Sequence, residues 1–420
     1  MKLDKNITTV VLAAGKGERM LSDIPKVLHE ICGKPMLGIL LDTVKILRFP
    51  APYVVIGCGG NEVKKAFAGY DARWVWQKEQ LGTAHAMLMV APYLKKLPEK
   101  LLVLYGDVPL IRPESIDALI RAHSASKAVL TVLTACVFSP SGYGRIISGK
   151  DGSLLDIVED KNASAEQKRI NEINTGIYVM NFKACLPLIK EIRKDKLKKE
   201  YYLTDLVKLL LQRGLPVKRH FADYTHEFMG INTQAELAGA VRLLLNRKLD
   251  ELYRSGVRII DPNTAYIEPG VEIGRGTVIY PFVVIHNGVK IGRNCSVGPF
   301  TQLRGNTVLK DRAEIGNFTE VKSSVIGSHT KAKHLSYLGD AVIGRDVNIG
   351  AGTITANYDG VGKFKTIIDD GAFIGSNSVL VAPVKIGKNA RTGATSVVTR
   401  NKNIPPGVTV AGVPARRLKD

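Results

Sequence analysis

The stretch "VEIGRGTVIYPFVVIHNGVKIGRNCSVGPF", residues 271–300, repeats an aliphatic residue followed by glycine with a period built on six residues. The pair recurs at Ile273, Ile291, Val297, Ile315, Ile343, Ile349, Ile374 and Ile386. The steps 273–291 and 297–315 are 18 residues, 291–297 and 343–349 are 6, and 374–386 is 12. Six residues suffice for one short strand and a turn, so three such units make a triangular coil with the aliphatic side chain pointing inward. The second half of the chain is therefore predicted to be a parallel β-helix of hexapeptide repeats, with each coil pairing with the next.

Working outward from this stretch, "TQAELAGAVRLLLNRKLDELYRSG" (233–256) has apolar residues at three- and four-residue spacing and ends at a glycine. This pattern predicts one long helix that connects two domains. A chain of 420 residues is also too long for one ordinary core. We therefore expect a first domain over residues 1–232, a linker helix over 233–256 and a β-helix domain over 257–420.

Residues 1–232 alternate short aliphatic runs with amphipathic stretches. The runs "TTVVLAAG", "YVVIGCG", "LLVLYGD" and "AVLTVLTACV" are typical of buried parallel strands. The segments "KPMLGILLDTVKIL" and "LGTAHAMLMVAPYL" between them are helix candidates. Strand–helix alternation predicts a doubly wound, Rossmann-like α/β domain that binds its ligands at the carboxyl ends of its strands.

The composition limits the partners. The net charge is +20, but the basic residues are dispersed without an RNP, zinc-finger or helix-turn-helix signature, so we expect phosphorylated small molecules rather than nucleic acid. The densest basic run, "KEIRKDKLKKEYY" (190–202), contains acids and indicates a solvated helix and loop, with anion contacts as the alternative. No apolar run approaches the roughly 20 residues that span a bilayer. Five dispersed cysteines without a CxxC motif favour a reduced, cytoplasmic setting.

The segment "LAAGKGERM" (12–20) follows the first expected strand and matches neither the P-loop nor the dinucleotide fingerprint. It does place two glycines where backbone amides could surround a triphosphate, with Lys16, Arg19 and later Lys26 as cations. Asp107 in "LYGDVPL" ends an apolar strand, where a hard anionic side chain is suited to Mg²⁺. Each segment alone is also compatible with an ordinary turn at the end of a strand.

Taken together, L-A-A-G-x-G-x-R-M, P-K, Q-L-G-T, Y-G-D-x-P, G-Y-G-R-I and E-I-N-T-G resemble the sugar-1-phosphate nucleotidylyltransferases. With "GAGTITANYDG" and "KAKHLSYLGD" in the repeat region, the chain more narrowly resembles the bifunctional N-acetylglucosamine-1-phosphate uridylyltransferase/glucosamine-1-phosphate acetyltransferase family. The resemblance extends from about residue 8 to about residue 414. It implies a left-handed β-helix and the synthesis of UDP-N-acetylglucosamine. The expected substrates are UTP, acetyl-CoA, glucosamine 1-phosphate and N-acetylglucosamine 1-phosphate.

The resemblance also implies site residues in the first half. Asp107 and Asn232 match the Mg²⁺ ligands, and Arg19 and Lys26 match the cations that hold the triphosphate and serve catalysis. Further matches to nucleotide- and sugar-contacting positions are Leu12, Ala13, Gly15, Gln77, Gly82, Thr83, Tyr105, Gly106, Gly144, Glu159 and Asn174. Of these, Gln77, Gly82 and Thr83 match the positions that contact uracil. Glu18 stands where threonine is common, and we expect its carboxylate to point away from the triphosphate.

In the second half the resemblance implies that His334 is the general base that takes a proton from the aminosugar. An imidazole is suited to this task because it ionises near neutrality. Matches to residues that hold the sugar phosphate are Arg304, Lys322, Tyr337 and Lys363, with Asn348 near the sugar. Matches to positions around acetyl-CoA are Ala351, Asn357, Tyr358, Ser376 and Ala394. Glu320 matches a carboxylate expected to orient the ring of His334.

The resemblance implies a homotrimer with active sites between subunits. Gly412 stands where that family commonly has an arginine near CoA. Three alternatives remain open: a nucleotidylyltransferase with a purely regulatory or oligomerising β-helix, an enzyme pair with other sugar or nucleotide specificity, and a binding subunit without catalysis. The presence of Lys26 and Asp107 argues against the last alternative, and the set around His334 argues against the first.

Overall fold

The computed structural model describes residues 7–195, 199–222 and 226–418. The chain divides into two compact units, Met1–Val241 and Arg242–Asp420. The division lies inside helix α7 (Gln234–Arg254), which occupies most of the stretch 233–256 where one long linker helix was expected. Each unit is described below by itself.

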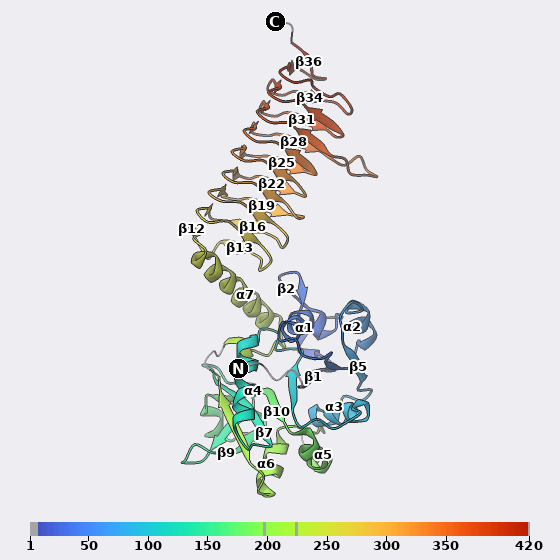
Figure 1. Cartoon of the computed structure of the whole chain (residues 1–420), viewed down its shortest axis with the longest axis vertical. Helices are drawn as coiled ribbons and strands as arrows, with labels where there is room; N and C mark the ends of the chain where they lie inside the picture. Colours follow the sequence, from blue (N-terminus) through green and yellow to red (C-terminus); the bar gives the residue numbers. More distant parts are fainter. Residues whose placement is uncertain (1–6, 196–198, 223–225, 419–420) are drawn as a thin grey trace. The chain divides into compact units, whose positions relative to one another are not determined.

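The first unit is built on a nine-stranded mixed sheet with the order β11-β7-β10-β6-β1-β4-β5, to which the β8–β9 hairpin is added beside β10 (Figure 1). The strands are β1 (Thr8–Ala13), β4 (Tyr53–Ile56), β5 (Arg73–Trp76), β6 (Leu101–Tyr105), β7 (Leu130–Cys136), β8 (Arg145–Ser148), β9 (Leu154–Val158), β10 (Glu172–Met180) and β11 (Val217–Phe221). A separate small hairpin joins β2 (Glu30–Ile31) and β3 (Lys34–Pro35). The four strands expected from the sequence are β1, β4, β6 and β7, and the structure contains all of them.

Helices cover both faces of this sheet. They are α1 (Met36–Ile46), α2 (Gly60–Ala66), α3 (Thr83–Val90), α4 (Pro113–Ala125), α5 (Phe182–Glu191) and α6 (Asp205–Gln212). Successive residues of β1 point to opposite faces: Val10 joins the core under α3, α5 and α6, whereas Val11 joins the core under α1, α2 and α4. The doubly wound α/β prediction is confirmed.

The sheet is not wholly parallel. β1 pairs in parallel with β4 and β6, but β10 runs antiparallel between β6 and β7. The carboxyl ends of β1, β4, β5 and β6 therefore lie at one edge of the sheet, and the loops that follow them meet there.

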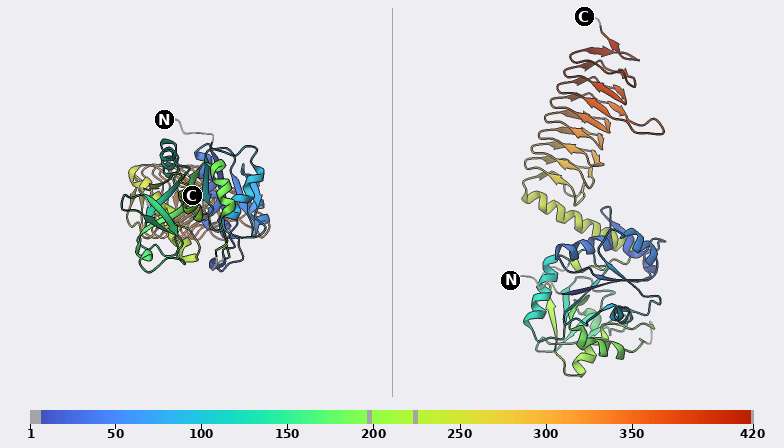
Figure 2. Two further views of the ribbon diagram at one scale, coloured as in Figure 1. Left: turned by 90° about the horizontal axis from the view of Figure 1, so that it is seen from below. Right: turned by 45° about the vertical axis from the view of Figure 1, so that its right-hand side comes forward.

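The second unit is a left-handed parallel β-helix with three sheets, and its stacked coils are visible in Figure 2. The first sheet contains β12 (Arg258–Ile259), β15 (Val278–Ile279), β18 (Ser296–Val297), β21 (Glu314–Asn317), β24 (Lys331–His334), β27 (Asn348–Ile349), β30 (Phe373–Ile374), β33 (Arg391–Thr392), β35 (Thr409–Ala411) and β36 (Arg416–Arg417). The second contains β13 (Ala265–Ile267), β16 (Val283–Ile285), β19 (Gln302–Arg304), β22 (Glu320–Lys322), β25 (Tyr337–Gly339), β28 (Ile354–Ala356), β31 (Val379–Val381) and β34 (Val397–Val398). The third contains β14 (Glu272–Ile273), β17 (Lys290–Ile291), β20 (Val308–Leu309), β23 (Val325–Ile326), β26 (Ala341–Ile343), β29 (Thr366–Ile368) and β32 (Val384–Ile386).

The aliphatic repeat positions stack in register inside the coil. Ile273 pairs with Ile291, and Ile291 pairs with Leu309, as the 18-residue step predicts. These side chains belong to one continuous core that extends from Leu249 of α7 to Val410 of β35. The coil between β26 and β29 is longer, since Ile343 pairs with Ile368. Its extra residues form the loop that projects after β28 (Figure 1).

Glycine is required at some corners because the next coil approaches too closely for a side chain. A Cβ on Gly327 would lie 2.2 Å from the carbonyl oxygen of Gly344. We expect Gly327→Ala to lower the free energy of unfolding by about 1–3 kcal/mol, since backbone of the neighbouring coil must move. Gly362→Ala is the control, because its Cβ would meet only ring atoms of Phe364, at 3.4 and 3.5 Å. Equal denaturant midpoints for the two variants would contradict this account.

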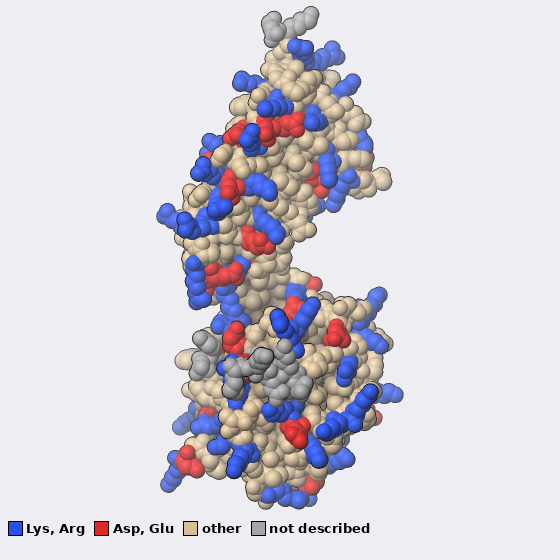
Figure 3. Space-filling view, in the orientation of Figure 1, with Lys and Arg blue, Asp and Glu red and all other residues tan. Residues whose placement is uncertain are grey.

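Basic side chains are spread over the face shown in Figure 3, with acidic side chains interspersed among them. This agrees with the dispersed charge seen in the sequence. Within residues 7–195, 199–222 and 226–418, no helix has both the length and the apolar character needed to cross a membrane.

Candidate active site

A cleft of about 940 Å³ lies in the first unit, at the edge of the sheet where the parallel strands end. Most of the residues expected to form the nucleotidyl-transfer site line it. They are Leu12, Gly15, Arg19, Lys26, Gln77, Gly82, Thr83, Tyr105, Asp107, Glu159 and Asn232. Four other expected residues, Ala13, Gly106, Gly144 and Asn174, lie behind or beside this lining.

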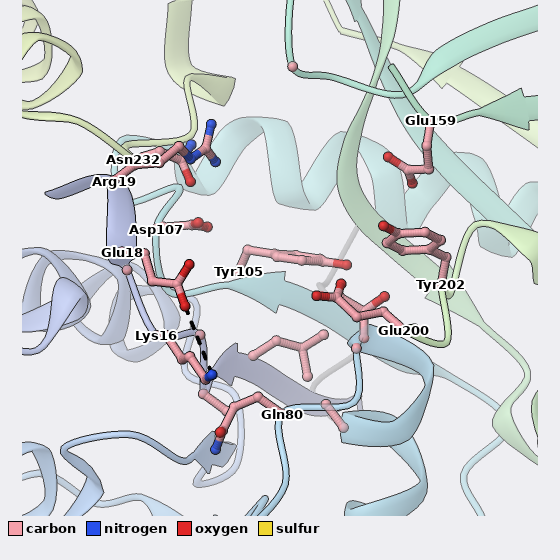
Figure 4. A pocket seen from close by; sticks show the side chains of 18 of the residues that line it. Lys16, Glu18, Arg19, Gln80, Tyr105, Asp107, Glu159, Glu200, Tyr202 and Asn232 are labelled. Carbon is pink, nitrogen blue, oxygen red and sulfur yellow. Dashed lines mark ion pairs between the residues drawn. The ribbon is translucent and has the colours of Figure 1, made fainter. Parts of the chain in front are cut away.

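Asp107 and Asn232 lie at one end of the cleft (Figure 4), and Lys26 contacts both of them. The ammonium of Lys26 donates to the carboxylate of Asp107, and it lies 2.7 Å from the amide oxygen of Asn232. Two hard oxygen ligands thus meet at one point, a donor set that suits Mg²⁺ when substrate phosphates and water supply its other positions. Among the described residues no group of three or more His, Cys, Asp or Glu side chains forms a metal site.

Local structure holds these three residues in place. The N–H of Ile231 donates to the carbonyl oxygen of Asp107 at 2.9 Å, which ties the Asn232 loop to the end of β6. Glu236 caps the start of α7, because its carboxylate accepts from the N–H groups of Asn232 and Thr233 at 2.6 and 2.9 Å. The sequence therefore fixes Asn232 immediately before a capped helix.

The glycine-rich loop packs directly on Lys26. Gly17 has φ 70°, and a Cβ there would lie 2.7 Å from Cβ of Lys26, so only glycine allows this approach. Glu18 lines the cleft and is 81% exposed, and its carboxylate lies 3.9 Å from the ammonium of Lys16 (Figure 4). Glu18 was expected to point away from the site. Its side chain is exposed, but it remains on the rim of the cleft beside Lys16.

Gln77, Gly82 and Thr83 form another wall of the cleft, between β5 and α3. Gly82 has φ 101°, and a Cβ there would lie 2.6 Å from the carbonyl oxygen of Tyr201. The hydroxyl of Thr83 accepts from the N–H of Leu203 at 2.9 Å. This wall is therefore fixed against the segment that leads into α6.

Tyr105 and Glu159 lie further along the cleft, away from Asp107 (Figure 4). Burial raises the pKa of the Tyr105 phenol well above its ordinary value. Thr204 donates to Glu159 Oε1 at 2.9 Å. Behind them Asn174 donates to the hydroxyl of Tyr178 at 2.7 Å, so its amide is oriented by a buried neighbour.

The pKa of Glu159 is raised, first by burial and further by nearby acids such as Asp205. The folded chain thus holds this proton more tightly than the unfolded chain, so stability is lost as the pH rises from the ordinary glutamate pKa through the raised one. We expect Glu159→Gln to be more stable than the wild type at pH 7 and equally stable below about pH 4. Thermal unfolding across this pH range measures the difference. Glu99→Gln, at an exposed position, is the control and should show no such change.

The sequence analysis did not anticipate several cleft residues, namely Gln80, Ser141, Lys161, Asn162, Asp195, Glu200 and Tyr202. Three of these, Asp195, Glu200 and Tyr202, come from the run 190–202 that was interpreted as a solvated helix and loop. Asn162 Nδ2 donates to Asp195 at 3.2 Å, which joins two loops at the cleft. The only sequence feature that pointed to these cleft residues was the presence of acidic residues and tyrosines within the basic run 190–202.

In the second unit, His334 heads a column of expected site residues. The register of β24 with β27 pairs Ala332 with Ile349, and carried two residues further it aligns His334 with Ala351. Carried onward through β30 and β33, the same register aligns Ala351 with Ser376 and Ser376 with Ala394. The N–H of Asn377 donates to the carbonyl oxygen of Ala351 at 2.6 Å, as expected for adjacent coils. A strip of small residues therefore leads along the coils to an exposed imidazole.

A cationic cluster lies on the second sheet of the solenoid. Arg304 pairs in register with Lys322, and the neighbouring Lys363 is the main cause of a lowered pKa at Lys322. Glu320 lies 2.7 Å from Nε of Arg304 and 2.5 Å from its NH2 nitrogen. Glu320 was expected to orient His334, whereas in the structure its carboxylate contacts the guanidinium of Arg304. The reason is register, because Glu320 lies opposite Tyr337 and one corner separates it from His334.

The other expected residues surround this cluster. The Tyr337 hydroxyl lies close to Gly339, since a Cβ there would be 2.5 Å from that oxygen and 2.8 Å from Asn357 Nδ2. The Asn357 amide donates to the Asp340 carboxylate. Tyr358 is exposed at the base of the projecting loop and pairs with Lys363. Asn348 lies in β27, on the first sheet, between Lys331 and Phe373. Gly412 has φ 94° and follows β35, while Arg416 and Arg417 are exposed on β36.

Comparisons with known proteins agree with this division. Residues 9–148 match the family described as MobA-like NTP transferase domain. Residues 260–367 match the GMPPB C-terminal domain, and residues 365–400 match the bacterial transferase hexapeptide (six repeats).

Full-length relatives show the same similarity in both units at once. The Bifunctional protein GlmU of Thermosipho africanus is 46% identical, and the alignment covers 94% of this chain and 92% of the relative. The proteins of the same name from Idiomarina loihiensis and Heliobacterium modesticaldum are 43% and 42% identical, over 94% and 98% of this chain and 93% and 97% of the relatives. The chain therefore belongs to the family of the bifunctional GlmU proteins.

Proposed function

We propose that this bifunctional transferase makes UDP-N-acetylglucosamine in two steps. The solenoid unit transfers the acetyl group of acetyl-CoA to the amine of glucosamine 1-phosphate. The α/β unit then transfers a uridylyl group from UTP to N-acetylglucosamine 1-phosphate and releases pyrophosphate. The observation that carries this proposal is the convergence of Lys26, Asp107 and Asn232 in the cleft, in a chain whose relatives match it across both units.

In the uridylyl step the sugar phosphate is already an anionic nucleophile, so positioning and charge neutralisation are the main demands on the protein. Asp107 and Asn232 supply the two oxygen atoms that would hold Mg²⁺. When bound, the metal neutralises charge on the phosphates of both substrates. Lys26 and Arg19 add positive charge, and Gly15 and Gly17 line the same cleft. Main-chain N–H groups of such a glycine-rich loop are donors for phosphate oxygens.

The remaining cleft residues are proposed to contact either the uracil base or the sugar. Gln77, Gly82 and Thr83 form the wall proposed to contact uracil. Tyr105 and Glu159 lie where the sugar would bind, and Asn174 and Gly144 support that wall from behind. Leu12, Ala13 and Gly106 belong to the ends of β1 and β6, where Gly106 N–H donates to Leu12 O at 2.9 Å.

In the acetyl step an ammonium cannot attack a thioester, so a base must take its proton. His334 is exposed at the head of the strip formed with Ala351, Ser376 and Ala394. A pantetheine arm lying along these small residues would bring its thioester to the imidazole. The positive charge of Lys322 and Lys363 suits the phosphate of the aminosugar.

Arg304, Tyr337, Asn348, Asn357 and Tyr358 complete the proposed acetyl site. Because Glu320 contacts Arg304 at 2.5–2.7 Å, its proposed role is to orient the guanidinium toward the phosphate. This role replaces the one expected from the resemblance.

The proposed assembly is a homotrimer that builds the acetyl site between subunits. It is supported by an exposed stack of three phenylalanine rings on one corner of the solenoid. Phe282 and Phe300 have centroids 4.8 Å apart, and Phe300 and Phe318 have centroids 4.9 Å apart. Their exposed fractions are 53%, 45% and 59%, which is unusual for adjacent aromatic side chains. A copy of the same chain would cover them.

The test offers purified protein glucosamine 1-phosphate, acetyl-CoA and UTP, together and separately, and identifies the products by mass. We expect N-acetylglucosamine 1-phosphate without UTP, and the UDP-sugar with pyrophosphate when UTP and Mg²⁺ are added. Light scattering of the same sample gives the oligomeric mass. Nucleotide transfer without acetyl transfer would support a regulatory solenoid instead.

A further inference from the structure

The side chain of Gln77 is held by two groups of its own chain. Gln77 follows β5, its N–H donates to the carbonyl oxygen of Ile56 at 2.8 Å, and it is only 3% exposed while lining the cleft. Its amide nitrogen Nε2 lies 3.1 Å from the carbonyl oxygen of Gly82 and 3.0 Å from Nδ1 of His85. His85 is on the first turns of α3 and does not itself line the cleft.

The hydrogen-bond donors and acceptors of these groups fix the orientation of the Gln77 amide. A carboxamide has two N–H donors on its nitrogen and one carbonyl oxygen that accepts. The oxygen of Gly82 can only accept, so Nε2 of Gln77 must face it. The second N–H of Nε2 then meets Nδ1 of His85, which must present its lone pair. Both donors are thereby used inside the protein, and only Oε1 of Gln77 remains to meet a ligand in the cleft.

We propose that His85 is a positioning residue that makes Gln77 an obligate hydrogen-bond acceptor and so selects uracil over cytosine. The inference rests on the proposed function, in which UTP is the nucleotide substrate and Gln77 contacts its base. It deepens that function by assigning pyrimidine selection to a residue outside the cleft wall.

The two bases differ at the edge that such an acceptor would meet. Uracil carries an N–H donor at N3, whereas cytosine has a lone pair at N3 and an amino group at C4. An oxygen fixed at this edge attracts uracil and repels cytosine. If His85 is removed, one N–H of Gln77 loses its partner and rotation of the amide becomes less costly. A rotated amide would offer a donor to the base, which suits N3 of cytosine.

The experiment measures kcat/KM for UTP and for CTP in the wild type, His85→Ala and His85→Asn, with the full chain and Mg²⁺. We expect the UTP-to-CTP ratio to fall about tenfold or more in His85→Ala, chiefly through KM of UTP, because a lost polar contact weakens discrimination. Asparagine can place its carbonyl oxygen near the position of Nδ1, so His85→Asn should recover most of the ratio. Met89→Ala, a partly buried residue on the same helix, is the matched control and should keep the wild-type ratio.

The outcomes separate the two claims. A wild type that does not use UTP overturns the proposed function and this inference with it. A wild type that uses UTP, together with a His85→Ala variant that keeps the full UTP preference, overturns the inference alone. Equal loss with both nucleotides in His85→Ala and Met89→Ala also overturns it, because helix packing would then be the cause. Unchanged circular dichroism and thermal unfolding of every variant show that the α/β unit is folded, since acetyl transfer reports only on the other unit.

Discussion

Asp107→Ala is expected to lower kcat for UDP-sugar formation by at least about 10³-fold, since loss of the proposed Mg²⁺ ligand would remove several kcal/mol of charge stabilisation. In the structure the Asp107 carboxylate is the only anionic oxygen that meets the Lys26 ammonium among the described contacts, and Asn232 adds a neutral amide. Without Asp107 the metal would keep one weak protein ligand. Pyrophosphate release, measured over a range of Mg²⁺ concentrations, checks the result.

Asp107→Asn sharpens this test, because it keeps the shape of the side chain and removes its charge. We expect it to need more Mg²⁺ for half-maximal rate than the wild type. Asp71→Ala, an exposed aspartate outside the cleft, is the control and should keep both the rate and the metal dependence. Acetyl transfer should be unchanged in all three variants, since the solenoid belongs to a separate unit. Parallel loss of both activities in Asp107→Ala would contradict the proposal of two independent sites.

How much of the fold could be predicted depends on how local its determinants are. The 18-residue step fixed the register of Ile273, Ile291 and their successors, because stacking in a solenoid involves neighbouring coils only. Strands β1, β4, β6 and β7 were evident from aliphatic runs. The antiparallel position of β10 was not, because β10 pairs with β6 and β7, which lie far from it in the chain. The long coil closed by Ile343 and Ile368 interrupts the period and was likewise not anticipated.

In the candidate site, too, contacts between residues far apart in the chain were harder to predict than local motifs. The resemblance suggested Lys26, Asp107 and Asn232 as site residues although they are far apart in the chain, and all three line the cleft. Partners set by side-chain geometry were missed, such as His85 beside Gln77. The partner of Glu320 was assigned differently from the structure, because its identity depends on which residues face each other across adjacent coils.

His334→Ala is expected to lower acetyl transfer by at least about 10²-fold, the usual contribution of a general base, while uridylyl transfer from supplied N-acetylglucosamine 1-phosphate stays at the wild-type rate. The loss should appear in kcat rather than in KM for acetyl-CoA. The reason is that the strip of Ala351, Ser376 and Ala394, where the cofactor is proposed to lie, is unchanged by the substitution.

The chain offers a close control for this variant. His329 lies five residues earlier on the same solenoid, is exposed, and contacts Asp346 at 3.2 Å. It lies at the corner before β24, whereas His334 is the last residue of β24, and it is outside the column that contains His334. His329→Ala should therefore keep full acetyl transfer, because a surface imidazole outside the column cannot reach the aminosugar. If His329→Ala and His334→Ala lose activity equally, the imidazole of His334 has no special part in proton transfer. A selective loss in His334→Ala, opposite to that in Asp107→Ala, would assign one chemical step to each unit.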